Sequence, residues 1–183
     1  LDGAVDKIAR AYFDFKPGPK TRVIVEDGRV FVKRAAAQKQ TYDMIMLDAF
    51  DAEYIPEHLL TREFLEEVKS ILTPNGVIVA NTWSNSALYD YESVTYRAVF
   101  GPFFNLKLGN RIILGRVGGI SPVDDMALAR QNAQTWEAEY KKFNTGRDFI
   151  LPLLSTNIDW NPTTRVLTDQ YSPSNLLNAL PRN

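Results

Sequence analysis

The sequence of 183 residues contains no cysteine and a single histidine, His58. The lack of cysteine excludes disulfide bonds, thiolate zinc sites and a cysteine nucleophile. A single histidine also excludes a histidine-rich metal site, and we expect no metal cofactor. His58 stands just before a predicted helix, and we interpret it as a structural or solvent-facing residue.

Neither sign of charge dominates, because 21 Lys and Arg residues face 22 Asp and Glu residues, for a net charge of −1. No basic field is available to attract nucleic acid, and we expect no such partner. The longest apolar runs, such as residues 76–80, are far too short to span a bilayer. Residues 1–6 lack the basic start and apolar stretch of a signal peptide. These features predict a cytoplasmic globular protein without a membrane partner.

Predicted helices alternate with predicted strands along most of the chain. Apolar spacing, caps and turn residues predict helices over residues 4–13, 29–37, 62–72, 86–100 and 124–143. A run rich in β-branched residues predicts a strand over residues 22–27, and short apolar runs bounded by turn residues predict strands over residues 42–48, 77–81, 103–108 and 111–117, the last two joined by a Gly109-Asn110 turn. The strand over residues 42–48 is almost continuously apolar, which is typical of burial on both faces.

This order of elements predicts an α/β fold with a doubly wound sheet that ends in an antiparallel hairpin. The Rossmann-like sheet of S-adenosylmethionine-dependent methyltransferases ends in the same way, which is an analogy of fold alone. We predict two regions: a partial Rossmann-like domain over residues 1–119, and a C-terminal helical and irregular extension over residues 120–183.

Polar and aromatic residues follow three of the predicted strands, where ligands of open α/β sheets bind. In chain order they are Asp27 and Gly28, then Asp48 and Asp51, then Asn81 and Trp83. Two carboxylates on a short loop can hold an ammonium group, and one of them can accept its proton. The carboxylate of Asp27 could accept the exocyclic amino group of an adenine. Each Asp also has a purely structural interpretation, as the cap of a turn or helix.

Several segments resemble, in order, those of the polyamine aminopropyltransferases, or spermidine synthases. The resemblance covers residues 1–117 well and the tail around residues 166–173 weakly. It is carried by residues 2–13, by Glu26-Asp27-Gly28-Arg29-Val30-Phe31, by Tyr42-Asp43-Met44-Ile45-Met46-Leu47-Asp48-Ala49-Phe50-Asp51, and by residues 60–64 and 72–77.

The resemblance implies transfer of an aminopropyl group from decarboxylated S-adenosylmethionine to a diamine such as putrescine. It makes Asp48 the general base and Asp51 the residue that holds the charged nitrogen of the substrate. Asp27 and Gly28 would bind adenine, and Asp2 matches a second cofactor-binding acid of the family. We interpret Asn81 and Trp83, which stand where the family has a different strand end, as substrate-binding.

The sequence also departs from the family pattern, because the glycine-rich loop and the N-terminal hairpin domain are absent from it. In the family strand order 3-2-1-4-5-7-6, the first two strands would separate the strand over residues 22–27 from the next one and leave apolar edges open. We therefore expect a fragment, with its sheet completed by a missing N-terminal segment or by a homo-oligomer. Activity of the chain alone stays open, as do two alternatives: an S-adenosylmethionine-dependent methyltransferase, or a non-catalytic fragment or assembly module.

Overall fold

The computed structural model describes residues 2–49, 54–83, 85–142 and 151–182. Its helices are α1 Gly3–Tyr12, α2 Gly28–Ala37, α3 Arg62–Ser70, α4 Leu88–Phe100, α5 Asp124–Thr135, α6 Glu137–Lys142 and α8 Ser174–Asn178, with short 3-10 helices η1 Glu57–Leu59 and η2 Leu151–Leu153. Its strands are β1 Tyr42–Leu47, β2 Leu72–Thr82, β3 Phe104–Leu108 and β4 Asn110–Arg116. From α2 onward helices and strands alternate up to the final strand pair, which confirms the predicted α/β class.

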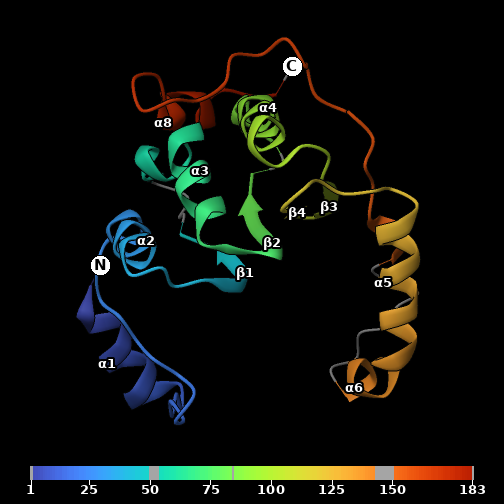
Figure 1. The fold of residues 1–183 in the computed structure, drawn as a ribbon. Helices are drawn as coiled ribbons and strands as arrows, with labels where there is room; N and C mark the ends of the chain where they lie inside the picture. The colour runs from blue at the N-terminus through green and yellow to red at the C-terminus, as the bar shows by residue number, and fades with distance from the viewer. Residues whose placement is uncertain (1, 50–53, 84, 143–150, 183) are drawn as a thin grey trace.

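The four strands form one sheet in the order β1-β2-β4-β3 (Figure 1). β1 and β2 are parallel, while β4 runs antiparallel to both β2 and β3. Gly109 makes the turn between β3 and β4 with a φ of 83°, a conformation that glycine adopts without steric cost. The predicted terminal hairpin is therefore confirmed, and the order corresponds to strands 4-5-7-6 of the expected sheet.

β2 begins earlier than the sequence predicts. Pro74-Asn75-Gly76, expected to precede the strand, lies inside it at a shift of register, where Tyr42 pairs with Leu72 but Met44 pairs with Val77. A Cβ at Gly76 would lie 2.9 Å from the carbonyl oxygen of Thr73. The irregularity therefore depends on a residue without a side chain.

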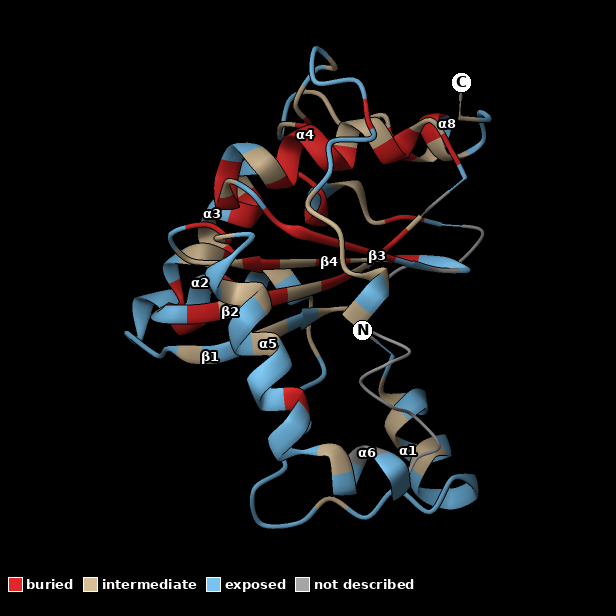
Figure 2. Ribbon diagram, turned by 90° about the vertical axis from the view of Figure 1, so that its right-hand side faces the viewer, coloured by how far each residue is buried: buried red, intermediate tan, exposed pale blue. Residues whose placement is uncertain are grey.

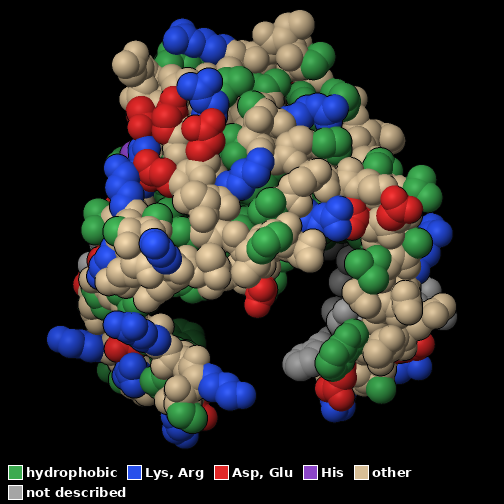
Figure 3. Space-filling view, in the orientation of Figure 1, with side chains coloured by type: hydrophobic (Ala, Val, Ile, Leu, Met, Phe, Trp, Pro, Cys, Tyr) green, Lys and Arg blue, Asp and Glu red, His purple; other side chains and the backbone are tan. Residues whose placement is uncertain are grey.

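Helices α3 and α4 cover one face of the sheet, where Ile78, Ala80 and Ile113 are buried beneath them (Figure 2). On the opposite face, Met44 is 55% exposed and Met46 is 65% exposed. The expectation that residues 42–48 are buried on both faces is therefore wrong, because no described helix covers this side of β1. Beyond this side α1 and α5 project from the sheet and leave a hollow between them (Figures 1 and 3).

The strand predicted over residues 22–27 is also wrong, since the structure assigns no strand there. A strand is stabilised by hydrogen bonds to a neighbouring strand, and β-branched residues alone do not supply them. These residues lie instead beside α1, and Val23 and Val25 are 42% and 52% exposed. β1 pairs only with β2 within the described residues, so the expected open edge is present.

Residues 160–178 lie on the side of the sheet that carries the helices (Figure 1). Trp160 stacks on Phe103 with ring centroids 5.1 Å apart, and Leu167 is fully buried. The backbone of Leu167 accepts a hydrogen bond from the N–H of Arg62 at 2.9 Å. The boundary at residue 120 stays a prediction, but the core already includes side chains from both predicted regions. The helix predicted over residues 124–143 consists of two, α5 and α6.

Candidate functional site

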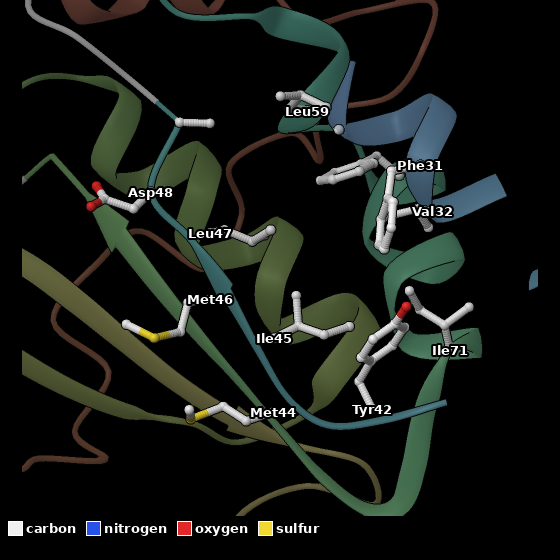
Figure 4. Close-up of a pocket in the computed structure, with 13 residues that line it drawn as sticks. Phe31, Val32, Tyr42, Met44, Ile45, Met46, Leu47, Asp48, Leu59 and Ile71 are labelled. Atoms are coloured by element: carbon white, nitrogen blue, oxygen red, sulfur yellow. The ribbon is translucent and has the colours of Figure 1, made fainter. Parts of the chain in front are cut away.

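Asp48 and Asn81 meet at the carboxyl ends of β1 and β2. The strands are parallel and adjacent, so the residues that follow them share one edge of the sheet. Asn81 donates a hydrogen bond from Nδ2 to Oδ1 of Asp48 at 3.0 Å. The carboxylate of Asp48 accordingly points toward β2 (Figure 4). The amide fixes one oxygen of this exposed carboxylate, and among the residues that the structure describes none contacts the other oxygen by a hydrogen bond.

A groove of about 400 Å³ runs between α2 and the free edge of β1 (Figure 4). Most of its wall is apolar, with Phe31 and Val32 of α2 facing Ile45 and Leu47 of β1. Asp48 and Leu59 lie toward one end, opposite Tyr42. The complete lining is Gly28, Phe31, Val32, Tyr42, Met44, Ile45, Met46, Leu47, Asp48, Ala49, Leu59, Phe64 and Ile71. The groove thus joins two predicted site residues, Gly28 and Asp48.

A second pocket, of about 500 Å³, adjoins Asp48 on the uncovered face of the sheet. Its lining includes Met46, Val79, Asn81 and Ile112. Asp48 therefore stands at a junction that a ligand could approach from the α2 side and from the uncovered face. A carboxylate in this position can serve two ligands bound side by side.

Asp27 caps the N-terminus of α2. Its Oδ1 accepts hydrogen bonds from the backbone N–H groups of Arg29 at 2.9 Å and Val30 at 3.1 Å. Its Oδ2 lies 2.9 Å from Nε2 of His58. Burial alone would raise the pKa of the Asp27 carboxyl. The hydrogen bonds outweigh burial and lower this pKa, and the one from His58 contributes most among them. Asp27 is therefore a firmly ionised acceptor beside Gly28.

Three further predicted site residues are not placed in this groove. Asp51 lies outside the residues that the structure describes. Asp2 caps α1 through a 2.8 Å hydrogen bond from the N–H of Ala4 and lines a separate pocket of about 310 Å³ beside residues 23–25. Trp83 packs against a second apolar cluster that contains Leu88 and Leu167. It is not among the residues lining the two pockets at Asp48. The assigned roles of these residues stay predictions.

Arg29 and Asp169 form a contact that the sequence did not indicate. The guanidinium of Arg29 pairs with both oxygens of Glu67 and both of Asp169, the closest distance being 2.8 Å to each residue. The hydroxyl of Thr61 donates to Asp169 at 2.7 Å. These pairs attach the tail to α2 and α3, where acidic and basic side chains gather (Figure 3). Arg29 and Asp169 are 140 positions apart, so no local pattern could predict the contact.

A buried polar cluster lies behind the site, between α4 and β4. Arg111 is fully buried, and its guanidinium stacks on the ring of Tyr89 at 3.8 Å from the centroid. It donates hydrogen bonds to Asn105 at 2.8 Å and to the hydroxyl of Ser93 at 2.8 Å. Glu92 is 1% exposed, and burial raises its pKa to about 8. The described residues contain no group of three or more His, Asp or Glu side chains arranged to hold a metal ion.

Comparison with known proteins gives consistent results. The spermine/spermidine synthase domain family matches residues 4–104. A polyamine aminopropyltransferase of Vibrio vulnificus is 46% identical over 181 residues, which cover 97% of this chain but 60% of that protein. The chain thus spans about three fifths of that relative.

Solved structures show the same likeness. A probable spermidine synthase from Corynebacterium glutamicum superimposes with a TM-score of 0.54 and 26% identity, covering 63% of this chain and 45% of that one. Human methyltransferase-like protein 13 in complex with SAH gives a TM-score of 0.57 and 25% identity, covering 68% of this chain and 60% of that one. Among the described residues, no helix is long and apolar enough to cross a membrane.

Proposed function

Because this chain belongs to the spermine/spermidine synthase family, we propose that it transfers an aminopropyl group from decarboxylated S-adenosylmethionine to a diamine such as putrescine. One observation carries the proposal: the groove beside β1 joins Gly28, next to the carboxylate of Asp27, with Asp48. An adenine-binding turn and a carboxylate base on one groove are what the reaction needs. The cytoplasmic location expected from the sequence stays a prediction.

The chemical step is a nucleophilic substitution at carbon. The lone pair of the neutral amine forms a bond to the aminopropyl carbon attached to the sulfonium, and the bond from that carbon to sulfur breaks. Methylthioadenosine leaves as a neutral thioether, while the new ammonium gives up a proton. Asp48 accepts that proton on Oδ2, the oxygen to which the Asn81 amide does not donate.

Binding of the two substrates would be divided between the two sides of Asp48. The carboxylate of Asp27 and the backbone of Gly28 recognise adenine on the α2 side. Asp51 holds the charged nitrogen of the diamine, while Asn81 and Trp83 contribute to the acceptor site. Asp2 is a second cofactor-binding acid. The roles of Asp2, Asp27, Gly28 and Asp51 come from the family resemblance, whereas those of Asn81 and Trp83 come from their place at the end of β2.

The free edge of β1 supports a second part of the proposal. Its pairing with β2 alone leaves one row of hydrogen-bonding groups without a strand among the described residues. Additional strands, from a longer form of the protein or from a second copy of this chain, would complete the sheet. The intact mass and the native mass of the purified protein distinguish the two.

A methyltransferase is the alternative function, favoured by the likeness to human methyltransferase-like protein 13, whose structure holds SAH. The two functions differ in the cofactor that is consumed. An aminopropyltransferase prefers decarboxylated S-adenosylmethionine and releases methylthioadenosine. A methyltransferase prefers S-adenosylmethionine itself.

The test begins with the intact mass and continues with calorimetry and turnover on the same sample. We expect binding of methylthioadenosine and decarboxylated S-adenosylmethionine, and release of methylthioadenosine when putrescine is added. Asp48→Asn should keep the affinity for methylthioadenosine but lower turnover by a factor of about 100 or more, because the base is lost.

Asp43→Asn is the matched control, since Asp43 lies on β1 and, within the part of the chain that the structure describes, its exposed carboxylate accepts a hydrogen bond only from the hydroxyl of Thr73, at 3.0 Å. Its turnover should equal that of the wild type. Equal turnover of Asp48→Asn and wild type would remove the catalytic role of Asp48. Failure to bind either adenosine compound would favour a non-catalytic module, and preference for S-adenosylmethionine would favour the methyltransferase.

A further inference from the structure

His58, interpreted from the sequence as structural or solvent-facing, lies against the predicted adenine-binding residue. It belongs to η1, and its Nε2 is 2.9 Å from Oδ2 of Asp27, 31 positions earlier in the chain. An ionised carboxylate can only accept hydrogen bonds, so Nε2 must carry the hydrogen of this contact. His58 is therefore a donor to Asp27.

The acceptor capacity of Asp27 is nearly used up. A carboxylate offers about four lone-pair positions. The backbone N–H groups of Arg29 and Val30 take both positions on Oδ1, and His58 takes one on Oδ2. One position on Oδ2 remains for a further donor. The exocyclic amino group of an adenine is a donor of that kind, whereas a carbonyl at the same ring position is not.

The position of His58 is itself fixed from two sides. Its backbone carbonyl accepts a hydrogen bond from Nη1 of Arg29 at 3.4 Å. Its neighbour Leu59 is buried in the core cluster that includes Val32 of α2. The imidazole is still 46% exposed. The backbone is thus anchored to α2 while the ring edge stays open to an incoming ligand.

We propose that His58 is a positioning residue for adenine: it holds Oδ2 of Asp27 so that the one remaining lone pair meets the exocyclic amino group. The proposal rests on the proposed function, because it assumes an adenosine ligand at Asp27. It adds a selectivity element, since the amino group is accepted only where the carboxylate is correctly turned. His58 does not touch the reacting atoms.

The test compares methylthioadenosine with its analogue that has hydrogen in place of the 6-amino group. Calorimetry of the wild type should give tighter binding of the amino compound. His58→Ala should weaken methylthioadenosine about fivefold to tenfold, the size of one hydrogen bond, and leave the analogue unchanged. His58→Gln, which places an N–H donor at similar reach, should restore binding to within about twofold.

A ligand-free measurement separates this inference from the proposed function. Carboxyl NMR of Asp27 should show an upward shift of its pKa in His58→Ala, because a hydrogen bond to the charged form is lost. Equal methylthioadenosine affinity in wild type and His58→Ala would overturn the positioning role, as would equal weakening of both ligands. If the NMR shift is seen but the wild type binds neither ligand, the adenine site itself is wrong, and the proposed function and this inference fall together.

Discussion

Replacing Glu92 by Gln should stabilise the protein at neutral pH. The side chain lies on α4 at 1% exposure, and neither carboxylate oxygen has a hydrogen-bond partner among the residues that the structure describes. Burial raises the pKa of this carboxyl from 4.5 to about 8, although the positive charge of Arg111 favours the charged form. Gln has nearly the same shape and no charge to bury.

The size of the effect follows from proton linkage. Between pH 4.5 and pH 8 the carboxyl of the unfolded chain is ionised while the folded protein still holds its proton. The folded state then binds more protons, so the free energy of unfolding falls as the pH rises through this range. Each pH unit is worth about 1.36 kcal/mol, which comes to about 3 kcal/mol at pH 7. Below pH 4.5 the effect vanishes.

Urea unfolding of wild type and Glu92→Gln at several pH values between 4 and 8 measures this difference. Titrations shared by both proteins cancel when the two free energies are subtracted. Glu66→Gln is the control, because its side chain is 59% exposed on α3 and substitution there should change stability by less than about 0.5 kcal/mol. A difference that stays constant with pH, or a less stable Glu92→Gln at pH 7, would refute the reasoning.

Two further substitutions test the packing of the sheet and the attachment of the tail. Gly76→Ala should destabilise by about 1–3 kcal/mol, because the new Cβ would lie 2.9 Å from the carbonyl oxygen of Thr73. Gly18→Ala is the control, because a Cβ there would have no atom within 4 Å, and it should be neutral or slightly stabilising. Thermal unfolding of both variants measures the difference, and equal melting temperatures would contradict the need for glycine at position 76. Arg29→Met removes both carboxylate pairs and should speed hydrogen exchange in residues 166–173 on the order of tenfold. Unchanged exchange there would mean that the apolar contacts alone hold the tail.

The sequence could predict those parts of the fold that local interactions determine. The β3–β4 hairpin follows from two short apolar runs on either side of a turn at Gly109, and the two runs are adjacent in the chain. The helices over residues 3–12 and 28–37 begin after Asp2 and Asp27, whose carboxylates accept hydrogen bonds from the first turn. Caps and turns of this kind act within four residues, so a sequence window contains them completely.

The failures concern residues whose structure depends on a distant neighbour. Residues 22–27 have strand composition but no adjacent strand, and composition cannot report the missing partner. Met44 and Met46 look like core residues, yet their exposure depends on which helices cover that face. Local sequence carries the preference of a segment for a structure, while the partner that stabilises it lies elsewhere.

The site shows the same division. Asp48 and Asn81 could be paired in advance because the strand-end rule places both at one edge, and the structure joins them at 3.0 Å. The contact between His58 and Asp27 could not be found, since nothing in either segment points to the other across 31 positions. The only available signal was that the single histidine precedes a helix beside acidic residues.

The packing of the C-terminal tail into the core has a consequence for how the protein folds during synthesis. Leu167 and Leu177 belong to the buried cluster beside α3 and α4, so this part of the core cannot close before both residues have been synthesised. Contacts across such long separations form slowly. Until then the helices on this face expose apolar surface that the tail later covers, and exposed apolar surface favours aggregation. Chaperone demand during synthesis should accordingly fall once the ribosome has released the last turn of the tail.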